Sequence, residues 1–398
     1  MNISLNKRLY LFALALVIYE FTMYAANDMI MPAMPKIVNE FKVSVNYIAL
    51  TMIVYMLGNS LLQLFLGPFS ARFGNRKIII LGNISFLIFT ILLAFTININ
   101  MFLFFRLLQG TGLAFIAMGY VLIHDNFNDE VAVKVTSLMA NISILAPVIG
   151  PVIGGVISNH ASWRYVFICS GITGIISLIG LIKYTPQNKS VLKKLNFKKV
   201  VHNYWQILLL PKFLLGSFAI SLSILPILLW IAISPTIIMH TLNLSVNKYM
   251  IYQVIATSGF LASSLVTQFV AGRVAITKII RMGAILSILS LVIGFIFYDY
   301  ILIVVISMFF LSFGIGQQIG TMFRIIGKLK TETPSMLFSM LAFIQNIILV
   351  SGINLSNNFL DKRGYLVFDF MFICFIVGVF ATILVFRFVK LNLGREWQ

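Results

Sequence analysis

Long apolar runs alternate with short polar breaks along the whole chain. Each run has about the 20 residues that a helix needs to cross the hydrocarbon core of a bilayer. The pattern therefore predicts an all-α membrane protein with twelve transmembrane helices. We place these spans near residues 9–31, 45–66, 78–96, 101–123, 136–158, 164–183, 212–238, 247–270, 279–297, 301–323, 335–356 and 365–387.

The composition points to the same class of protein. Hydrophobic residues make up 60% of the 398 and charged residues only 10%, with a mean hydropathy of +1.01. Soluble domains average about 45–50% apolar residues, so a soluble fold could not bury this much apolar surface. The first run is longer than a signal-peptide core and contains Glu20, and we interpret it as an uncleaved first span.

The net charge is +18, and the basic residues are divided unequally between the two sides of the predicted membrane. Most Lys and Arg fall in the N-terminus, in the connections that lead from an even span to an odd one, and in the C-terminus. The opposite side holds Lys36, Lys42, Arg164, Lys248, Lys362 and Arg363. This is the positive-inside pattern, and it predicts that both termini are cytoplasmic. The basic charge thus follows the topology and does not indicate nucleic-acid binding.

The longest polar break, 184–211, divides the spans into two sets of six. We therefore expect an N-terminal half at 1–188, a cytoplasmic linker at 189–211 and a C-terminal half at 212–398. The linker interleaves lysines with apolar residues, which is typical either of an amphipathic helix on the anionic leaflet or of a solvated linker. Two six-helix halves with related connections are the architecture of a secondary transporter.

Two carboxylates lie in the first apolar run, at Glu20 and Asp28. A charge at the centre of a span costs roughly 2.5–3.5 kcal/mol on insertion scales, so such an acid is a functional candidate. Eight residues on a helix correspond to about 12 Å of rise and roughly 80° of rotation. The two acids therefore share a broad sector without bonding to each other. They could carry protons or neutralise a cationic substrate, while Asp28 could also be an interfacial acid.

Arg106 is the one basic residue that lies well inside a predicted span and not at its end. A buried arginine needs acids or carbonyls facing it. It could be a fixed cation whose partner changes on protonation, or a structural pin between helices. In the fifth span, residues 146–155 contain two prolines and three glycines, which indicates a bent and closely packed helix.

Enzyme signatures are missing from the sequence. The four histidines lie at span ends or in connections, no His/Cys cluster has metal-ligand spacing, and no Gly-rich phosphate loop is followed by Lys. Cys169 and Cys374 fall inside predicted spans and suggest no disulfide framework. We expect no metal, no cofactor and no enzymatic activity.

Three segments resemble signatures of the major facilitator superfamily, and within it of the drug/proton antiporters with twelve spans. They are the cytoplasmic connection 67–77, the run 105–110 around Arg106 and the run 150–155 in the fifth span. Segments 19–32, 138–141 and 225–235 are similar to a multidrug-transporter branch of these antiporters. The resemblance extends over essentially the whole chain.

The resemblance implies roles for individual residues. Glu20 and Asp28 would bind protons and cationic substrates, and Arg106 would couple protonation to the conformational change. The implied cavity-lining residues are Tyr24, Asn27, Met52, Tyr55, Asn141, Leu228 and Ile231. The antiporter motif would comprise Gly150, Pro151, Gly154 and Gly155. The cytoplasmic gate loop would contain Gly67, Arg72, Gly74 and Arg76.

One position departs from the family pattern. The cytoplasmic loop usually carries an aspartate where this chain has Ala71, which removes the expected partner of Arg72. A helix C-terminus or another acid could take its place.

The expected function is proton-driven multidrug efflux, with lipophilic cationic and neutral compounds exported by alternating access. We expect a monomer in the bacterial inner (cytoplasmic) membrane whose partners are protons, lipophilic drugs and the bilayer. The alternatives are a proton-coupled transporter of the same fold for one metabolite or peptide, and a receptor that binds without transporting.

Overall fold

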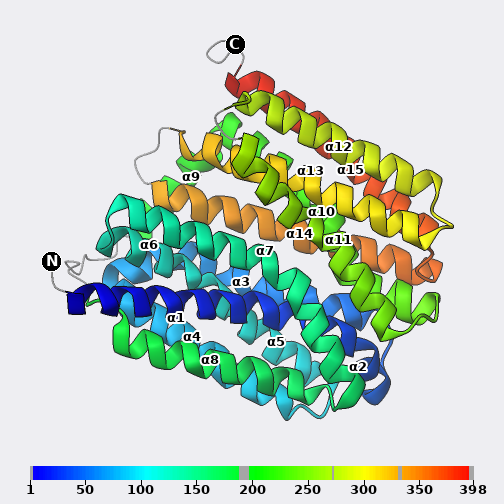
Figure 1. Ribbon diagram of the computed structural model, residues 1–398, viewed down its shortest axis with the longest axis horizontal. Coiled ribbons are helices and arrows are strands. Elements are labelled where there is room, and N and C mark those ends of the chain that lie inside the picture. Colours follow the sequence, from blue (N-terminus) through cyan, green and yellow to red (C-terminus); the bar gives the residue numbers. More distant parts are fainter. Residues whose placement is uncertain (1–2, 188–196, 271–272, 330–333, 394–398) are drawn as a thin grey trace. The chain divides into compact units, whose positions relative to one another are not determined.

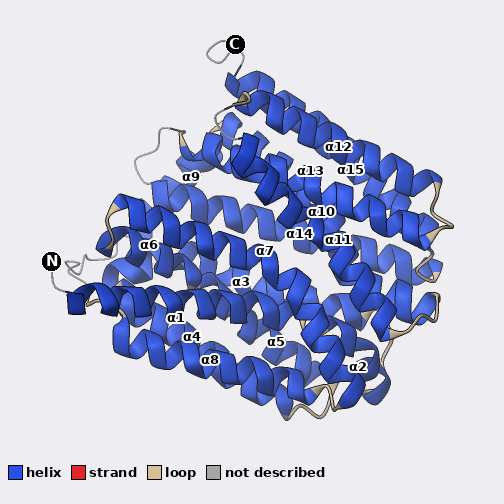
Figure 2. Ribbon diagram, in the orientation of Figure 1, coloured by secondary structure: helices blue, strands red, loops and turns tan. Residues whose placement is uncertain are grey.

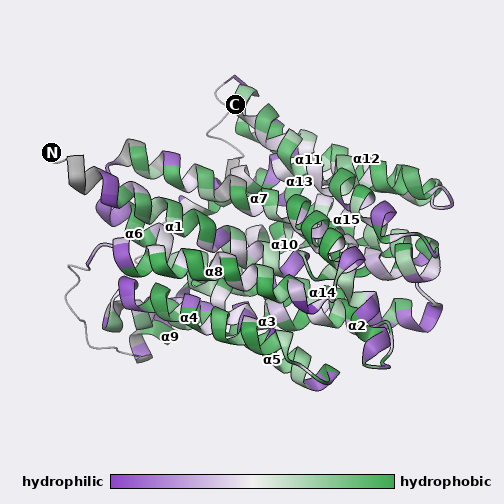
Figure 3. Cartoon of the chain, turned by 60° about the horizontal axis from the view of Figure 1, so that its bottom comes forward, coloured by the Kyte–Doolittle hydropathy of each residue, from purple (hydrophilic) through white to green (hydrophobic). Residues whose placement is uncertain are grey.

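The computed structural model describes residues 3–187, 197–270, 273–329 and 334–393 of the chain. All regular secondary structure in these ranges is helical (Figure 2). Twelve of the described helical segments are long and apolar enough to cross a membrane, which confirms the predicted number of spans. Figure 3 shows hydrophobic residues along the lengths of the helices and hydrophilic residues concentrated near their ends.

The chain divides into two compact units, and the start of the second span belongs to the later one. The first unit contains Met1–Val43 and Val54–Val200, and the second contains Ser44–Ile53 and Val201–Gln398. The helices up to the linker are α1 (Ile3–Asp28), α2 (Met34–Glu40), α3 (Tyr47–Phe73), α4 (Asn75–Ala94), α5 (Ile99–Ala114), α6 (Ile116–Asn126), α7 (Asp129–His160) and α8 (Arg164–Tyr184).

Within the first unit, α1 packs against α7 and α8, and α4 packs against α5 and α8 (Figure 1). Its core is apolar: Phe12, Leu16 and Met23 of α1 are fully buried in one cluster with Phe86 of α4 and Leu122 of α6. Because lipid gives no hydrophobic drive for helix pairing, this close packing is what holds the helices together. The cluster therefore fixes the position of α1, the helix that carries both candidate acids.

The second unit contains most of the linker helix and the last six spans. Its helices are α9 (Phe197–Leu208), α10 (Pro211–Pro235), α11 (Val246–Val270), α12 (Ile276–Ile296), α13 (Ile301–Gly327), α14 (Pro334–Arg363) and α15 (Val367–Leu393). Helix α10 packs against α13, α14 and α15, while α13 also packs against α11 and α12. As a result α10 is the most enclosed of the twelve spans.

Three predicted spans are not single regular helices. The first ends its main helix at Asp28 and continues as a 3₁₀ turn (Met31–Ala33) and α2. Pro32 and Pro35 explain this break, because neither has an N–H to continue the ladder. The fourth span changes from α5 to α6 at Phe115, and the seventh continues beyond α10 as a π-helix, Thr236–Thr241.

Residues 188–196 of the predicted linker region lie outside the described ranges, so the structure covers only the rest of it. Helix α9 has apolar residues on a buried face and also on an exposed face. Tyr204 and Ile207 are buried, whereas Val201 and Trp205 are more than half exposed. An exposed apolar stripe on a helix outside the spans agrees with contact to a lipid surface, which stays a prediction.

Candidate functional site

The two candidate acids lie inside the first unit. Glu20 has 2% of its surface exposed, Asp28 has 5%, and Arg106 is completely buried. Glu20 is in the middle of α1, Asp28 is its last residue, and Arg106 lies two turns into α5. Burial of three ionisable side chains among apolar helices requires specific polar partners, because each would otherwise face an unfavourable medium.

Glu20 receives one hydrogen bond across the unit. The hydroxyl of Tyr120, on α6, donates to Oε1 over 3.1 Å. The second oxygen, Oε2, is buried and has no hydrogen-bond partner among the described residues. Tyr24 lies one helical turn further along α1 and is half-buried. Glu20 thus has one fixed oxygen and one that is available to a proton or a cation.

Asp28 and Arg106 are joined through Asn27. The Asn27 amide nitrogen donates to Asp28 Oδ1 over 3.2 Å, and its oxygen accepts from Arg106 Nη2 over 3.0 Å. Arg106 Nη1 donates to Gln109 Oε1 over 2.7 Å, and the guanidinium carbon is 4.5 Å from the centre of the Tyr55 ring. The ion pairs found among the described residues do not include Arg106. Its charge is held by amide oxygens and an aromatic face.

The partners of Arg106 are themselves fixed. Gln109 Nε2 donates to the hydroxyl of Thr90 on α4 over 2.8 Å, and Thr90 donates to the carbonyl of Phe86. The Tyr55 hydroxyl donates to the carbonyl of Met23 on α1 over 2.7 Å. These bonds connect α1, α3, α4 and α5, so a movement of Arg106 would disturb several helices at once.

The predicted antiporter motif packs against the end of α1. A Cβ atom on Gly154 would lie 1.8 Å from the carbonyl oxygen of Met29, and one on Gly150 would lie 3.1 Å from Cβ of Asp28. Pro151 and Gly155 are buried beside them. Glycine is required here because α7 approaches the backbone of α1 directly. The motif therefore supports the position of Asp28.

The predicted cytoplasmic connection is short, and one glycine fixes its turn. Gly74 has φ of +86°, a conformation that favours glycine, and it separates α3 from α4. Arg76 donates to the carbonyl of Ile182 in α8 over 3.0 Å. The guanidinium of Arg72 lies 5.3 Å from the ring centre of Phe73. Gly67 and Ala71 lie within α3. The surroundings of these two positions are outside the described part of the structure.

The remaining predicted cavity residues are distributed over the two units. Tyr24, Asn27 and Tyr55 belong to the first unit with Glu20, while Met52, Leu228 and Ile231 belong to the second. Met52 and Ile231 are buried and Leu228 is half-buried. The side chain of Asn141 is outside the described part of the structure. Their shared role in a cavity therefore stays a prediction.

Sequence reasoning missed three residues of this site: Tyr120, Gln109 and Thr90. Gln109 could have been predicted from the sequence, because it lies one helical turn after Arg106 and therefore on the same face. Tyr120 and Thr90 carried no comparable signal. Each is an ordinary polar residue in an apolar span, and only the packing of α4 and α6 brings it to the site.

Comparisons with known proteins identify the family of the chain. The family model of the Major Facilitator Superfamily matches residues 16–353. Multidrug transporter MdfA of Yersinia pestis is 34% identical over 377 residues, which cover 92% of each chain. Chloramphenicol resistance protein CraA of Acinetobacter baumannii is 32% identical over 404 residues, covering 99% of this chain and 95% of its own.

Solved structures show the same fold at low sequence identity. A D-xylose-proton symporter superposes with a TM-score of 0.79 at 14% identity, covering 98% of this chain and 99% of its own. A bacterial homologue of the human lysosomal transporter Spinster, in an inward-facing and unoccupied conformation, gives 0.74 at 16% identity and covers 98% of each chain. With twelve apolar helices and a family match over most of its length, the chain is a multi-pass membrane protein that belongs to the major facilitator superfamily.

Proposed function

We propose that this protein exports lipophilic cationic and neutral compounds from the cell in exchange for protons. The observation that carries the proposal is the pair of buried acids on α1: Glu20 with an unpaired oxygen, and Asp28 linked through Asn27 to Arg106. The similarity to MdfA and CraA, whose names describe multidrug transport and chloramphenicol resistance, supports the same activity.

Buried carboxyls can exchange a proton for a cation. When Glu20 is protonated it is neutral and tolerates its apolar surroundings, and when it is ionised it attracts a positive substrate. Proton entry from outside would then displace the substrate. The driving force is adequate, since each pH unit supplies about 1.4 kcal/mol and each net charge moved gains roughly 2.3 kcal/mol per 100 mV.

Arg106 would transmit the charge of Asp28 to the helices. The Asn27 side chain donates to Asp28 and accepts from Arg106. Protonation of Asp28 weakens it as an acceptor, because a neutral carboxyl oxygen binds an amide less strongly than a carboxylate. The amide and the guanidinium would then reorient. The contact of Arg106 with the Tyr55 ring would pass that change to α3, and the bond from Gln109 to Thr90 would pass it to α4.

Breadth of substrates follows from the residue types expected around the acids. Methionine and aromatic side chains in a binding cavity can adapt to ligands of different shape. We also propose that the protein acts as a monomer in the bacterial cytoplasmic membrane. Both termini would face the cytoplasm, because the basic residues are concentrated in the connections on that side.

The test is an export assay in cells that produce Glu20→Gln with Asp28→Asn. Ethidium efflux should be lost although the protein is present in membranes at a normal level, since neither amide can take up a proton. Asp125→Asn is the matched control, because Asp125 is an exposed acid of the same unit. Undiminished efflux by the double variant would exclude the two acids as the coupling site.

A transporter for a single metabolite or peptide makes a different prediction. It would protect cells against at most one compound and its near analogues. We expect protection against several chemically unrelated toxic compounds, measured as growth at increasing concentrations. Protection confined to one chemical series would contradict the multidrug proposal and leave proton coupling intact.

A further inference from the structure

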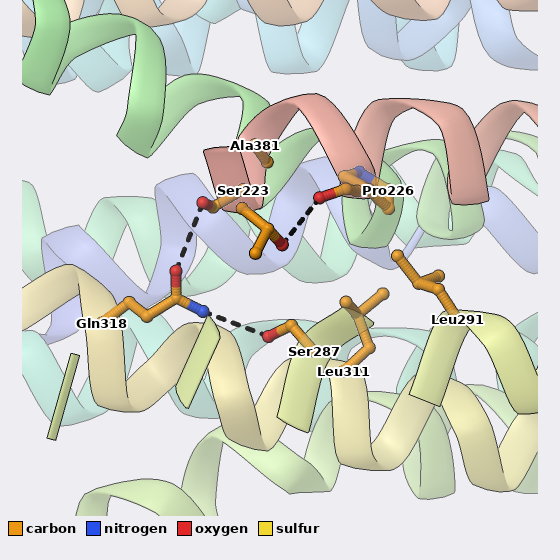
Figure 4. Close-up of a pocket in the computed structure, with 9 residues that line it drawn as sticks. Ser223, Pro226, Ser287, Leu291, Leu311, Gln318 and Ala381 are labelled. Atoms are coloured by element: carbon orange, nitrogen blue, oxygen red, sulfur yellow. Dashed lines mark hydrogen bonds between the residues drawn. The ribbon is translucent and has the colours of Figure 1, made fainter. Parts of the chain in front are cut away.

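A small cavity lies inside the second unit, enclosed by α10, α12, α13 and α15 (Figure 4). Its volume is about 10 Å³, close to the space that one water molecule needs. The lining residues are Ser223, Pro226, Ser287, Leu291, Leu311, Gln318, Gly378, Ala381 and Thr382. All of them lie well inside spanning segments, so the cavity is at membrane depth.

Each hydrogen-bond donor of the polar side chains around the cavity already has an acceptor. Gln318 Nε2 donates to Ser287 Oγ and to the carbonyl of Gly314, each over 3.1 Å. Because that carbonyl can only accept, it fixes the amide so that Oε1 faces Ser223, which donates to it over 3.4 Å. Ser287 and Thr382 donate to backbone carbonyls of their own helices. Figure 4 shows the bonds of Gln318 to Ser223 and Ser287.

What remains open toward the cavity are acceptor lone pairs. Each hydroxyl oxygen can accept a further hydrogen bond, and so can Gln318 Oε1. An occupant must therefore donate hydrogen bonds. The lining contains no Asp or Glu, and a cation without an opposite charge is very unfavourable inside a membrane. These two conditions together favour a neutral donor.

Pro226 leaves one backbone carbonyl of α10 without its usual hydrogen-bond donor. Proline has no N–H, so the carbonyl of Leu222, one turn earlier on α10, loses its usual helical partner. In spanning helices, ordered water is one of the groups that satisfy a backbone acceptor freed by proline.

We propose that this cavity is a binding site for a single buried water molecule, which donates hydrogen bonds to the oxygens of α10, α12, α13 and α15. The water joins the four helices at the proline break of α10. The site is independent of the acids on α1 and does not depend on the transport proposal.

The test is hydroxyl-radical footprinting of the purified full-length protein by X-ray radiolysis in ¹⁸O-labelled water. Radicals form at bound waters and modify the nearest side chains. Leu291 and Leu311 have only 1% of their surface exposed, yet both should be labelled, whereas the fully buried Leu229 of α10, which does not line the cavity, should not. Equal background labelling of all three leucines would show a dry cavity and overturn the proposal.

A pair of variants makes the test specific. Gln318→Leu removes the central amide, so labelling of Leu291 and Leu311 should fall to the level of Leu229. Gln317→Leu is the matched control, because Gln317 is a buried neighbour on α13 that does not line the cavity, and labelling should persist. A thermal transition raised by sodium but not by choline chloride, and no longer so in Gln318→Leu, would identify a cation instead and contradict the assignment of water.

Discussion

Arg106 is a buried cation without a direct salt bridge among the described residues, and its Nε has no hydrogen-bond partner there. Two amide oxygens and the face of Tyr55 disperse its charge. A direct bond to Asp28 would hold both groups ionised, because each would stabilise the charge of the other. With Asn27 between them, the carboxyl stays free to change its charge. The neutral bridge is thus compatible with a proton cycle, whereas a tight ion pair would oppose it.

Tyr120 orients Glu20, and its removal should affect cationic substrates most. Tyr120→Phe deletes the hydroxyl that binds Oε1 and changes little else in shape. One lost hydrogen bond to a charged group is worth about 1.5–3 kcal/mol. Ethidium binding should therefore weaken by roughly tenfold or more, with chloramphenicol, a neutral compound, affected much less.

Equilibrium binding of the two compounds to purified protein measures this difference. Tyr10→Phe is the control, because Tyr10 is an exposed residue of the same helix as Glu20. An equal loss of affinity for both compounds would show that Tyr120 supports the fold of the site and does not act through the charge of Glu20.

At this scale the sequence predicts the acids but not their environment. Glu20, Asp28 and Arg106 stand out because a charge in an apolar run is costly unless it has a specific partner. Their partners do not stand out. Tyr120 is 100 residues from Glu20, and Asn27 is 79 from Arg106, so only the tertiary packing joins them.

At the scale of elements, the contact between α7 and α1 governs where Asp28 lies. Gly154 meets the backbone of Met29, and a methyl group there has no space. We expect Gly154→Ala to displace the end of α1 and to reduce export strongly. Overpacking of this kind costs about 1–3 kcal/mol, so the thermal transition should fall as well.

Gly171→Ala in α8 is the matched control, because a Cβ atom at that position would have no neighbour within 4 Å. Export and thermal stability should both be unchanged in this variant. Export and a thermal transition at normal levels in Gly154→Ala would show that α7 and α1 are less closely packed than the structure has them.

The sequence located all twelve spans but not their internal breaks. Apolar runs are long and unambiguous, so their number and approximate bounds follow from hydropathy alone. The break after Asp28 follows from Pro32 and Pro35, although the length of the run concealed it. The change at Phe115 and the π-helix at Thr236–Thr241 depend on neighbouring helices and have no sequence signal of comparable strength.

At the scale of the molecule, the distribution of Lys and Arg predicts the orientation of all twelve spans. Alkaline phosphatase is active only outside the cytoplasm. Fused after Ser162, between α7 and α8, it should be active, whereas fused at the C-terminus it should be inactive. The reverse pattern of activities would invert the topology and place the basic connections outside.

The whole account depends on carboxyls that exchange protons for substrate. The most direct measurement is proton release when ethidium is added to purified, detergent-solubilised protein in weakly buffered solution near neutral pH. We expect release that saturates with ethidium and is absent from the variant Glu20→Gln with Asp28→Asn. Ethidium binding without any release of protons from the unmodified protein would contradict the account.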